Sequence, residues 1–202
     1  MSVPWQPAAD ARGLLLVGGG PARVGSWVRR GLVACRVVPL GRWTAVVPAE
    51  PWSRARPPYD DALTVLTGRP LPVRLRPGLG LFTSGGRAVL TVQPRGWRAT
   101  QRWLVWEPGR GVVPTPGLPP AAPVDLERAA GSGRRVGAVL ADPGGDAHQL
   151  LVQVLGVLGL PGRELLAGDP VGRVVVPSGR TVARFEARVA EEVRHRTELE
   201  EG

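Results

Sequence analysis

The chain has 202 residues, of which 43% are hydrophobic, so it is long enough for one large or two small domains and too apolar to be wholly disordered. Its formal charge is +9, and its 26 basic residues are all arginine, because lysine is missing together with asparagine and isoleucine. These three amino acids share AT-rich codons, so their absence indicates a high-GC bacterium. The single cysteine, Cys35, excludes an intramolecular disulfide and is expected to be a small core residue. Residues 1–12 show no secretory signal and no apolar run is long enough to cross a bilayer, which predicts a cytoplasmic protein without a membrane partner.

The first 70 residues predict alternating short strands and helices. The expected elements are a strand at 13–19, a helix at 21–30, strands at 33–39 and 42–48, and a helix at 59–67. Pro21 suits the first turn of a helix, and Leu40-Gly41 is a tight-turn signal between two β-rich runs. The acidic pair Asp60-Asp61 opens the second helix, where carboxylates suit the positive end of the helix dipole.

The next stretch predicts an antiparallel meander with one apolar face and one face rich in arginine. Its expected strands are 79–83, 88–93, 102–107 and 112–113. Ser84-Gly85-Gly86 supplies the positive φ angles that a hairpin turn needs. The order strand–helix–strand–strand–helix–strand resembles a ferredoxin-like βαββαβ unit with an added β-meander.

Residues 114–123 (PTPGLPPAAP) contain five prolines, which predicts a semi-rigid linker and a domain boundary. The expected domains are a basic α+β domain at 1–113 and a small α/β domain at 124–202 that ends in a long amphipathic helix. The expected elements of the second part are a helix at 125–130, a strand at 135–141, a helix at 146–158, a strand at 173–177 and a helix from 178 or 181 to about 199. Asp146 and Gln149 fit a capping box at the start of the central helix. The fold class is therefore α+β, with a mixed or antiparallel sheet in the N-terminal domain and a small helical α/β part after it.

Positive charge is concentrated in the first half of the chain. Residues 1–113 carry 16 arginines and five carboxylates, whereas residues 114–202 carry 10 arginines and 12 carboxylates. Codon usage does not explain this asymmetry, which indicates either a polyanionic partner or neutralisation of one half by the other within the fold. The stretch around 94–110 interleaves arginine with tryptophan, as in surfaces that bind single-stranded nucleic acid. The residues expected to bind a polyanion, either nucleic acid or an acidic protein, are Arg87, Arg95, Trp97, Arg98 and Arg102.

A glycine-rich turn follows the first strand. The segment 14–32 (LLLVGGGPARVGSWVRRGL) resembles the dinucleotide-binding start of flavoproteins, where glycines let the backbone approach a pyrophosphate. This resemblance makes Gly18, Gly19 and Gly20 candidate cofactor-binding residues. It departs from the pattern at Arg23, which occupies the position of the third glycine, so a plain strand-turn-helix is the better interpretation of the segment.

Catalytic and metal-binding signals are lacking. The two histidines, His148 and His195, lie far from each other and from Cys35 in sequence and give no metal spacing. We therefore expect no catalytic residue, no metal and no cofactor, and a non-catalytic binding or adaptor protein whose basic half docks a polyanionic partner. The alternatives are a small nucleotide-binding enzyme that uses Gly18–Gly20 and a structural subunit that assembles with copies of itself as a homo-oligomer.

Overall fold

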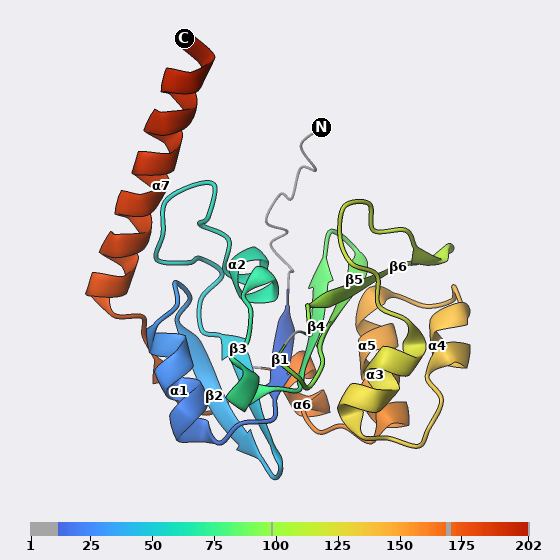
Figure 1. The fold of residues 1–202 in the computed structure, drawn as a ribbon. Helices are drawn as coiled ribbons and strands as arrows, with labels where there is room; N and C mark the ends of the chain where they lie inside the picture. The colour runs from blue at the N-terminus through green and yellow to red at the C-terminus, as the bar shows by residue number, and fades with distance from the viewer. Residues whose placement is uncertain (1–11, 98, 169–170, 202) are drawn as a thin grey trace.

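The computed structural model describes residues 12–97, 99–168 and 171–201, and its strands form one antiparallel sheet (Figure 1). The eight strands within these residues lie in the order β7-β6-β5-β4-β1-β3-β2-β8. Their bounds are β1 Gly13–Val17, β2 Cys35–Leu40, β3 Trp43–Pro48, β4 Gly78–Ser84, β5 Arg87–Gln93, β6 Arg102–Glu107, β7 Gly111–Val113 and β8 Arg173–Val175. The predicted α+β class is confirmed.

The middle of the sheet is a ferredoxin-like unit. Its strand order is β4-β1-β3-β2, and each neighbouring pair is antiparallel. Helices α1 (Pro21–Arg29) and α2 (Ala62–Gly68) make the two crossovers and contribute to one buried cluster, so they cover the same face. The strands β5, β6 and β7 extend the sheet beyond β4 as the expected meander, while β8 adds a strand beyond β2.

Local sequence explains why the two crossover helices begin where they do. Pro21 occupies the first turn of α1, where the missing N–H costs nothing. The carboxylate of Asp61 caps α2 by accepting a hydrogen bond of 2.6 Å from the backbone N–H of Thr64. A short 3-10 helix, η1 (Val73–Leu75), then leads into β4.

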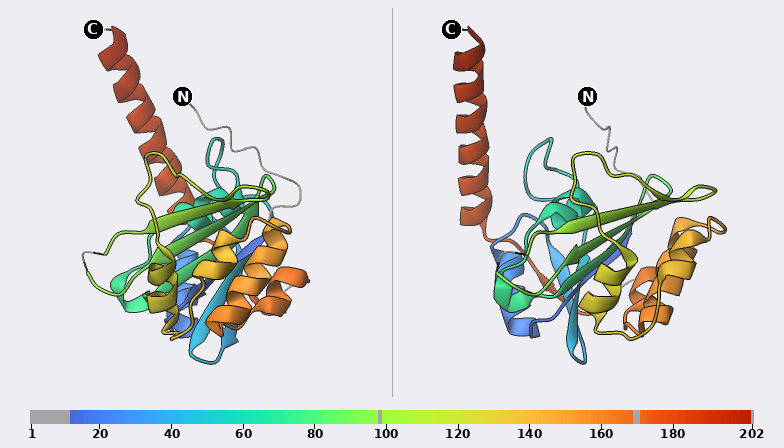
Figure 2. Two further views of the ribbon diagram at one scale, coloured as in Figure 1. Left: turned by 90° about the vertical axis from the view of Figure 1, so that its right-hand side faces the viewer. Right: turned by 45° about the vertical axis from the view of Figure 1, so that its right-hand side comes forward.

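Four helices cover the opposite face of the sheet (Figure 2). They are α3 (Pro123–Ala130), α4 (Gly137–Ala141), α5 (Ala147–Leu158) and α6 (Arg163–Ala167). The predicted capping box of α5 is present: Asp146 accepts from the Gln149 backbone at 2.8 Å, and the Gln149 side chain accepts from the Asp146 backbone at 3.3 Å. In this part of the structure α6 is a further helix that the sequence did not predict, because five residues are too few for a periodic signal.

The prediction of a strand at 135–141 is wrong, because Gly137–Ala141 within this segment form the helix α4. Val136 and Leu140 are buried and Val139 is partly buried, which is the i, i+3, i+4 spacing of one helix face. The Glu127 side chain of α3 accepts a hydrogen bond of 2.9 Å from the Val136 backbone and so anchors the start of this turn. A run of so few apolar residues does not distinguish a helix from a strand by itself.

The proline-rich segment 114–123 is hydrogen-bonded to strand β6 of the sheet. The carbonyl of Pro119 accepts from the Trp103 N–H at 2.8 Å, and the Ala121 N–H donates to the Trp103 carbonyl at 2.7 Å. Proline lacks a donor but keeps its acceptor, so a proline-rich strip can still pair with a strand along one side. The helices that follow share one hydrophobic cluster with the sheet, and β8 pairs with β2. Residues 114–123 therefore connect two parts of the chain that contribute to a common core.

Helix α7 (Gly179–Glu201) projects away from the sheet and its covering helices (Figures 1 and 2). It contacts the segment before α2 through an edge-to-face pair between Phe185 and Tyr59, with ring centroids 5.1 Å apart. Glu186 lies 3.8 Å from Arg56 in an exposed ion pair. Among the described residues, no helix combines the length and the apolar character needed to span a membrane.

Cys35 is buried in β2, and burial raises the pKa of its thiol to about 12. The unfolded chain releases this proton near pH 9, whereas the folded chain holds it, so the unfolded state is favoured as the pH rises above 9. We expect the free energy of unfolding to fall by about 1 kcal/mol between pH 9 and 10. The measurement is urea unfolding across this range, and Cys35→Ala is expected to remove the dependence.

A matched control for this prediction is Tyr59→Phe, which removes a hydroxyl group from an exposed side chain and should leave the slope unchanged. The chain contains no lysine, so few other side chains titrate in this range. A fall in stability that survives in Cys35→Ala would contradict the assignment. Burial lowers the pKa of Arg69 to about 10, so loss of its proton raises stability as the pH approaches and passes 10, which opposes the effect of Cys35 and sets the upper limit of the range.

Candidate functional site

Arg102, a predicted polyanion-binding residue, is paired with a carboxylate of the protein itself. Its Nη1 atom donates to both carboxylate oxygens of Asp125, at 2.8 and 2.9 Å. Asp125 is only 7% exposed and also accepts a hydrogen bond of 2.9 Å from the Ala122 backbone at the start of α3. Arg102 therefore joins β6 to α3 on the face that α3, α4, α5 and α6 cover.

Arg87 is also paired within the fold. It lies 2.8 Å from Glu107, and the second carboxylate oxygen of Glu107 accepts from Arg110 at 2.8 Å. Because side chains alternate along a strand, Glu107 and Arg102 on β6 lie on opposite faces of the sheet. The structure therefore does not bring Arg87 and Arg102 together on one surface. Arg98 lies outside the described residues.

Arg95 and Trp97 lie in the loop between β5 and β6, at residues 94–101, where both side chains are exposed. The indole of Trp97 is 74% exposed. Arg76 fixes this loop by donating from Nη1 to the carbonyls of Gly96 and Ala99, at 2.7 and 2.8 Å. The loop is thus held against the segment that carries η1.

Gly18 and Gly19 allow close packing of the backbone against η1. The Gly18 N–H donates to the carbonyls of Leu75 and Pro77, at 3.2 and 2.9 Å, so it is already used within the protein. A Cβ atom at Gly19 would lie 2.4 Å from the Leu75 side chain, and the Gly19 carbonyl accepts from the Thr44 hydroxyl at 2.7 Å. The turn therefore brings η1 against the end of β1, and Gly20 alone of the three has open space beside it.

This packing gives a prediction for Gly18. In Gly18→Ala the added Cβ would lie 2.9 Å from the Pro77 ring and 3.2 Å from the Arg76 carbonyl, neither of which moves easily. We expect a loss of about 1–3 kcal/mol in the free energy of unfolding, measured by urea denaturation.

The control for Gly18→Ala is Gly20→Ser at the N-cap of α1, where no side chain caps the helix. Serine there is expected to stabilise by a few tenths of a kcal/mol. Equal stabilities of the Gly18 variant and the parent would show that close packing does not require this glycine.

The contacts of Gly18 and Arg76 assemble four exposed residues at one end of the sheet. We call this group the basic end surface, and it consists of Arg23 in the first turn of α1, Arg74 in η1, and Arg95 and Trp97 in the β5–β6 loop. Figure 2 shows η1 near both α1 and this loop. Among the described residues, Arg23, Arg74 and Arg95 form no ion pair with a carboxylate. Sequence reasoning missed Arg23 and Arg74, because the segments that carry them are linked to the loop only through the contacts of Gly18 and Arg76 in the folded chain.

Arg69 is an arginine with a structural role, because it holds two helices together. Its guanidinium lies 4.0 Å from the ring centroid of Trp27 and donates to the Trp27 carbonyl at 2.6 Å. Burial lowers the pKa of Arg69 to about 10. This side chain joins the end of α2 to α1 and is not available to a partner.

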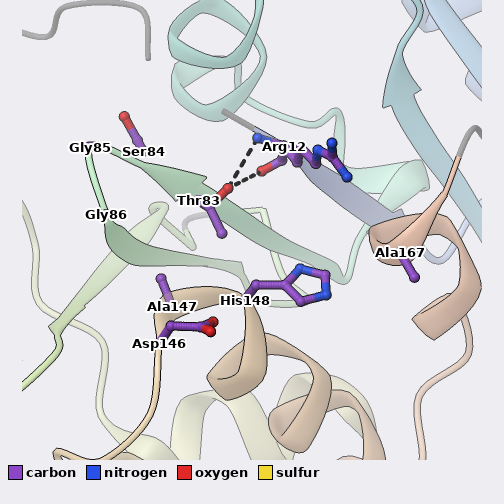
Figure 3. Close-up of a pocket in the computed structure, with 9 residues that line it drawn as sticks. All are labelled: Arg12, Thr83, Ser84, Gly85, Gly86, Asp146, Ala147, His148 and Ala167. Atoms are coloured by element: carbon purple, nitrogen blue, oxygen red, sulfur yellow. Dashed lines mark hydrogen bonds between the residues drawn. The ribbon is translucent and has the colours of Figure 1, made fainter. Parts of the chain in front are cut away.

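A polar pocket of about 430 Å³ lies where the β4–β5 hairpin approaches the start of α5 (Figure 3). Its lining includes the side chains of Arg12, Asp146 and His148. The Thr83 hydroxyl bonds the Arg12 backbone, while the Asp146 carboxylate caps α5. In the part of the chain that the structure describes, His148 makes no hydrogen bond to a nucleophile, and no three metal-ligating side chains cluster.

The chain matches no protein-family model, no curated protein and no solved structure, so the geometry of its own residues is what bears on function.

Proposed function

We propose that this protein is a non-catalytic binding protein that docks single-stranded nucleic acid on the basic end surface. The observation that carries the proposal is the exposed indole of Trp97 among arginines that form no ion pair with a described carboxylate. Guanidinium groups bind phosphates, and an exposed indole offers a face on which a base stacks.

The local electrostatics support an anionic partner. Arg23 lies in the first turn of α1, where the helix dipole is positive and a basic side chain stabilises the helix least. Arg76 adds a further positive charge, and its partners among the described residues are backbone carbonyls. A phosphate chain would therefore meet positive potential from α1, η1 and the β5–β6 loop together.

The proposal distinguishes between arginines that bind and arginines that hold the fold. Arg87 and Arg102 are paired with Glu107 and Asp125, and they belong to the second group. An acidic protein surface is the competing partner, and charge alone would suit either. The exposed indole of Trp97 favours nucleic acid over an acidic protein, because a base can stack on an aromatic ring and a carboxylate cannot.

The test is fluorescence anisotropy of a labelled single-stranded oligonucleotide of about ten nucleotides at salt concentrations from about 50 to 200 mM. Binding should weaken steeply with salt, and Arg74→Ala and Arg95→Ala should each reduce the slope by about 1 on the logarithmic plot. Trp97→Ala should weaken binding about 5- to 100-fold with little change in that slope.

The matched control is Arg128→Ala, which removes an equally exposed arginine from α3 on the other face. It should leave the affinity unchanged. Binding that is insensitive to salt, or equal loss in Arg74→Ala and Arg128→Ala, would contradict the proposal. Equal competition by polyglutamate and by unlabelled oligonucleotide would favour an acidic protein instead.

A further inference from the structure

A second pocket, of about 220 Å³, lies between α2 and the meander on the face that α1 and α2 cover. Helix α2 is only seven residues long and packs on β3, so it leaves part of β4, β5 and β6 beside it uncovered by a helix. Leu118 from the proline-rich segment forms a further wall, because the bonds from Pro119 and Ala121 to Trp103 hold that segment along β6.

The side chains that line the pocket favour a planar, uncharged ring as the ligand. Two aromatic side chains, Phe82 and Trp103, form part of the walls together with Leu63 and Val89, and none of the described residues that line the pocket is charged. Small-molecule sites are of this kind, mostly apolar with a few polar groups that orient the ligand. An anion would gain nothing inside this pocket, whereas an aromatic ring would lose water on both faces.

The hydroxyl groups that line the pocket favour a heteroaromatic ring over a hydrocarbon ring as the ligand. The side chains of Thr64, Thr67 and Ser84 line it, and within the described residues their hydroxyls make no hydrogen bond. Each hydroxyl both donates and accepts, so these groups suit the ring nitrogens and carbonyls of a base.

The pocket is connected to the basic end surface through the loop at 94–101. Gln101, at the end of this loop, donates to the Thr67 carbonyl of α2 at 2.6 Å, and Trp103 follows two residues later in β6. A strand whose phosphates lie on Arg74 and Arg95 can therefore place a base toward Trp103. We infer that the pocket between α2 and β6 binds one unstacked nucleobase of the nucleic acid, an inference that rests on the proposed function for its physiological ligand.

Two measurements separate this inference from the proposed function. The first compares an oligonucleotide with an abasic oligomer of equal length, which has the same phosphates. The parent protein should bind the oligonucleotide about 5- to 100-fold more tightly. Thr64→Phe fills the pocket from its exposed rim and should reduce this ratio strongly without changing the salt slope, whereas Thr64→Ser keeps the space and a hydroxyl and should preserve the ratio.

The second measurement follows methyl NMR signals of Leu63, Val89 and Leu118 during titration with an uncharged nucleoside. These signals should shift in the parent and not in Thr64→Phe, a result that would support the pocket even if no oligomer bound. A nucleoside that leaves them unmoved overturns the inference. If Thr64→Phe leaves the ratio of the two oligomer affinities unchanged while binding still depends steeply on salt, the inference that the pocket binds a base is overturned. The proposed function would then stand. Toluene that competes as well as the nucleoside would assign the pocket to any apolar ring and overturn the assignment to a base.

Discussion

A fragment that ends at Val113 is expected to lose cooperative unfolding altogether. It would retain the strands from β1 to β7 but lack α3, α4, α5 and α6, which cover one face of the sheet. Leu14, Leu81 and Leu90, each no more than 2% exposed in the full chain, would then face water. A sheet with an uncovered apolar face associates or remains loosely packed.

The measurement is thermal unfolding by near-UV circular dichroism, with dye binding to exposed apolar surface. The control is a chain that ends at Ser178, which lacks only α7 and should unfold cooperatively, since α7 contacts the rest through few side chains such as Phe185 and Glu186. A sharp transition in the fragment that ends at Val113 would support two independent domains with a boundary at 114–123.

Asp125→Ala is expected to lower the free energy of unfolding by about 3 kcal/mol, with a fall in Tm of roughly 6–12 °C. The carboxylate receives both hydrogen bonds from Arg102 and the bond from the Ala122 N–H, so one substitution removes an ion pair and the cap of α3. The side chain of Arg102 is 45% exposed and can be hydrated after the change, which limits the loss.

The control for Asp125 is Arg87→Ala, which breaks a pair whose arginine is 53% exposed and should cost about 1 kcal/mol or less. Asp125→Asn keeps an oxygen for the Ala122 N–H and should fall between the parent and Asp125→Ala. If Asp125→Ala and Arg87→Ala have equal effects in urea unfolding, the buried position of Asp125 does not strengthen its interactions.

Most of the fold can be predicted from local patterns, because each pattern has a short-range cause. The capping residues Asp61 and Asp146 and the Gly85-Gly86 turn act within a few residues of themselves. The strand order of the ferredoxin-like unit follows from two crossovers and a hairpin. Segments with weak or ambiguous patterns were the ones missed, namely α4, where a strand was expected, and α6.

The candidate site was less predictable, because it depends on contacts between distant segments. The arginine–tryptophan pattern correctly drew attention to the loop that carries Arg95 and Trp97, yet it grouped them with Arg87 and Arg102, which pair with carboxylates. Glu107 and Asp125 lie 20 and 23 residues from those arginines, and no spacing rule predicts such pairs. The grouping of Arg23 and Arg74 with the loop arises from hydrogen bonds of Gly18 and Arg76.

The pairing of β8 with β2 affects how the chain folds during its synthesis. Cys35 lies opposite Val175, so the outer edge of β2 is closed by residues that a ribosome adds 140 positions later. At about 5–20 residues per second, this interval lasts roughly 7 to 28 s. During it, the nascent chain exposes a row of unpaired backbone groups that other chains can join. Emerging chains of this protein are therefore expected to need a chaperone that shields this edge until β8 has been synthesised.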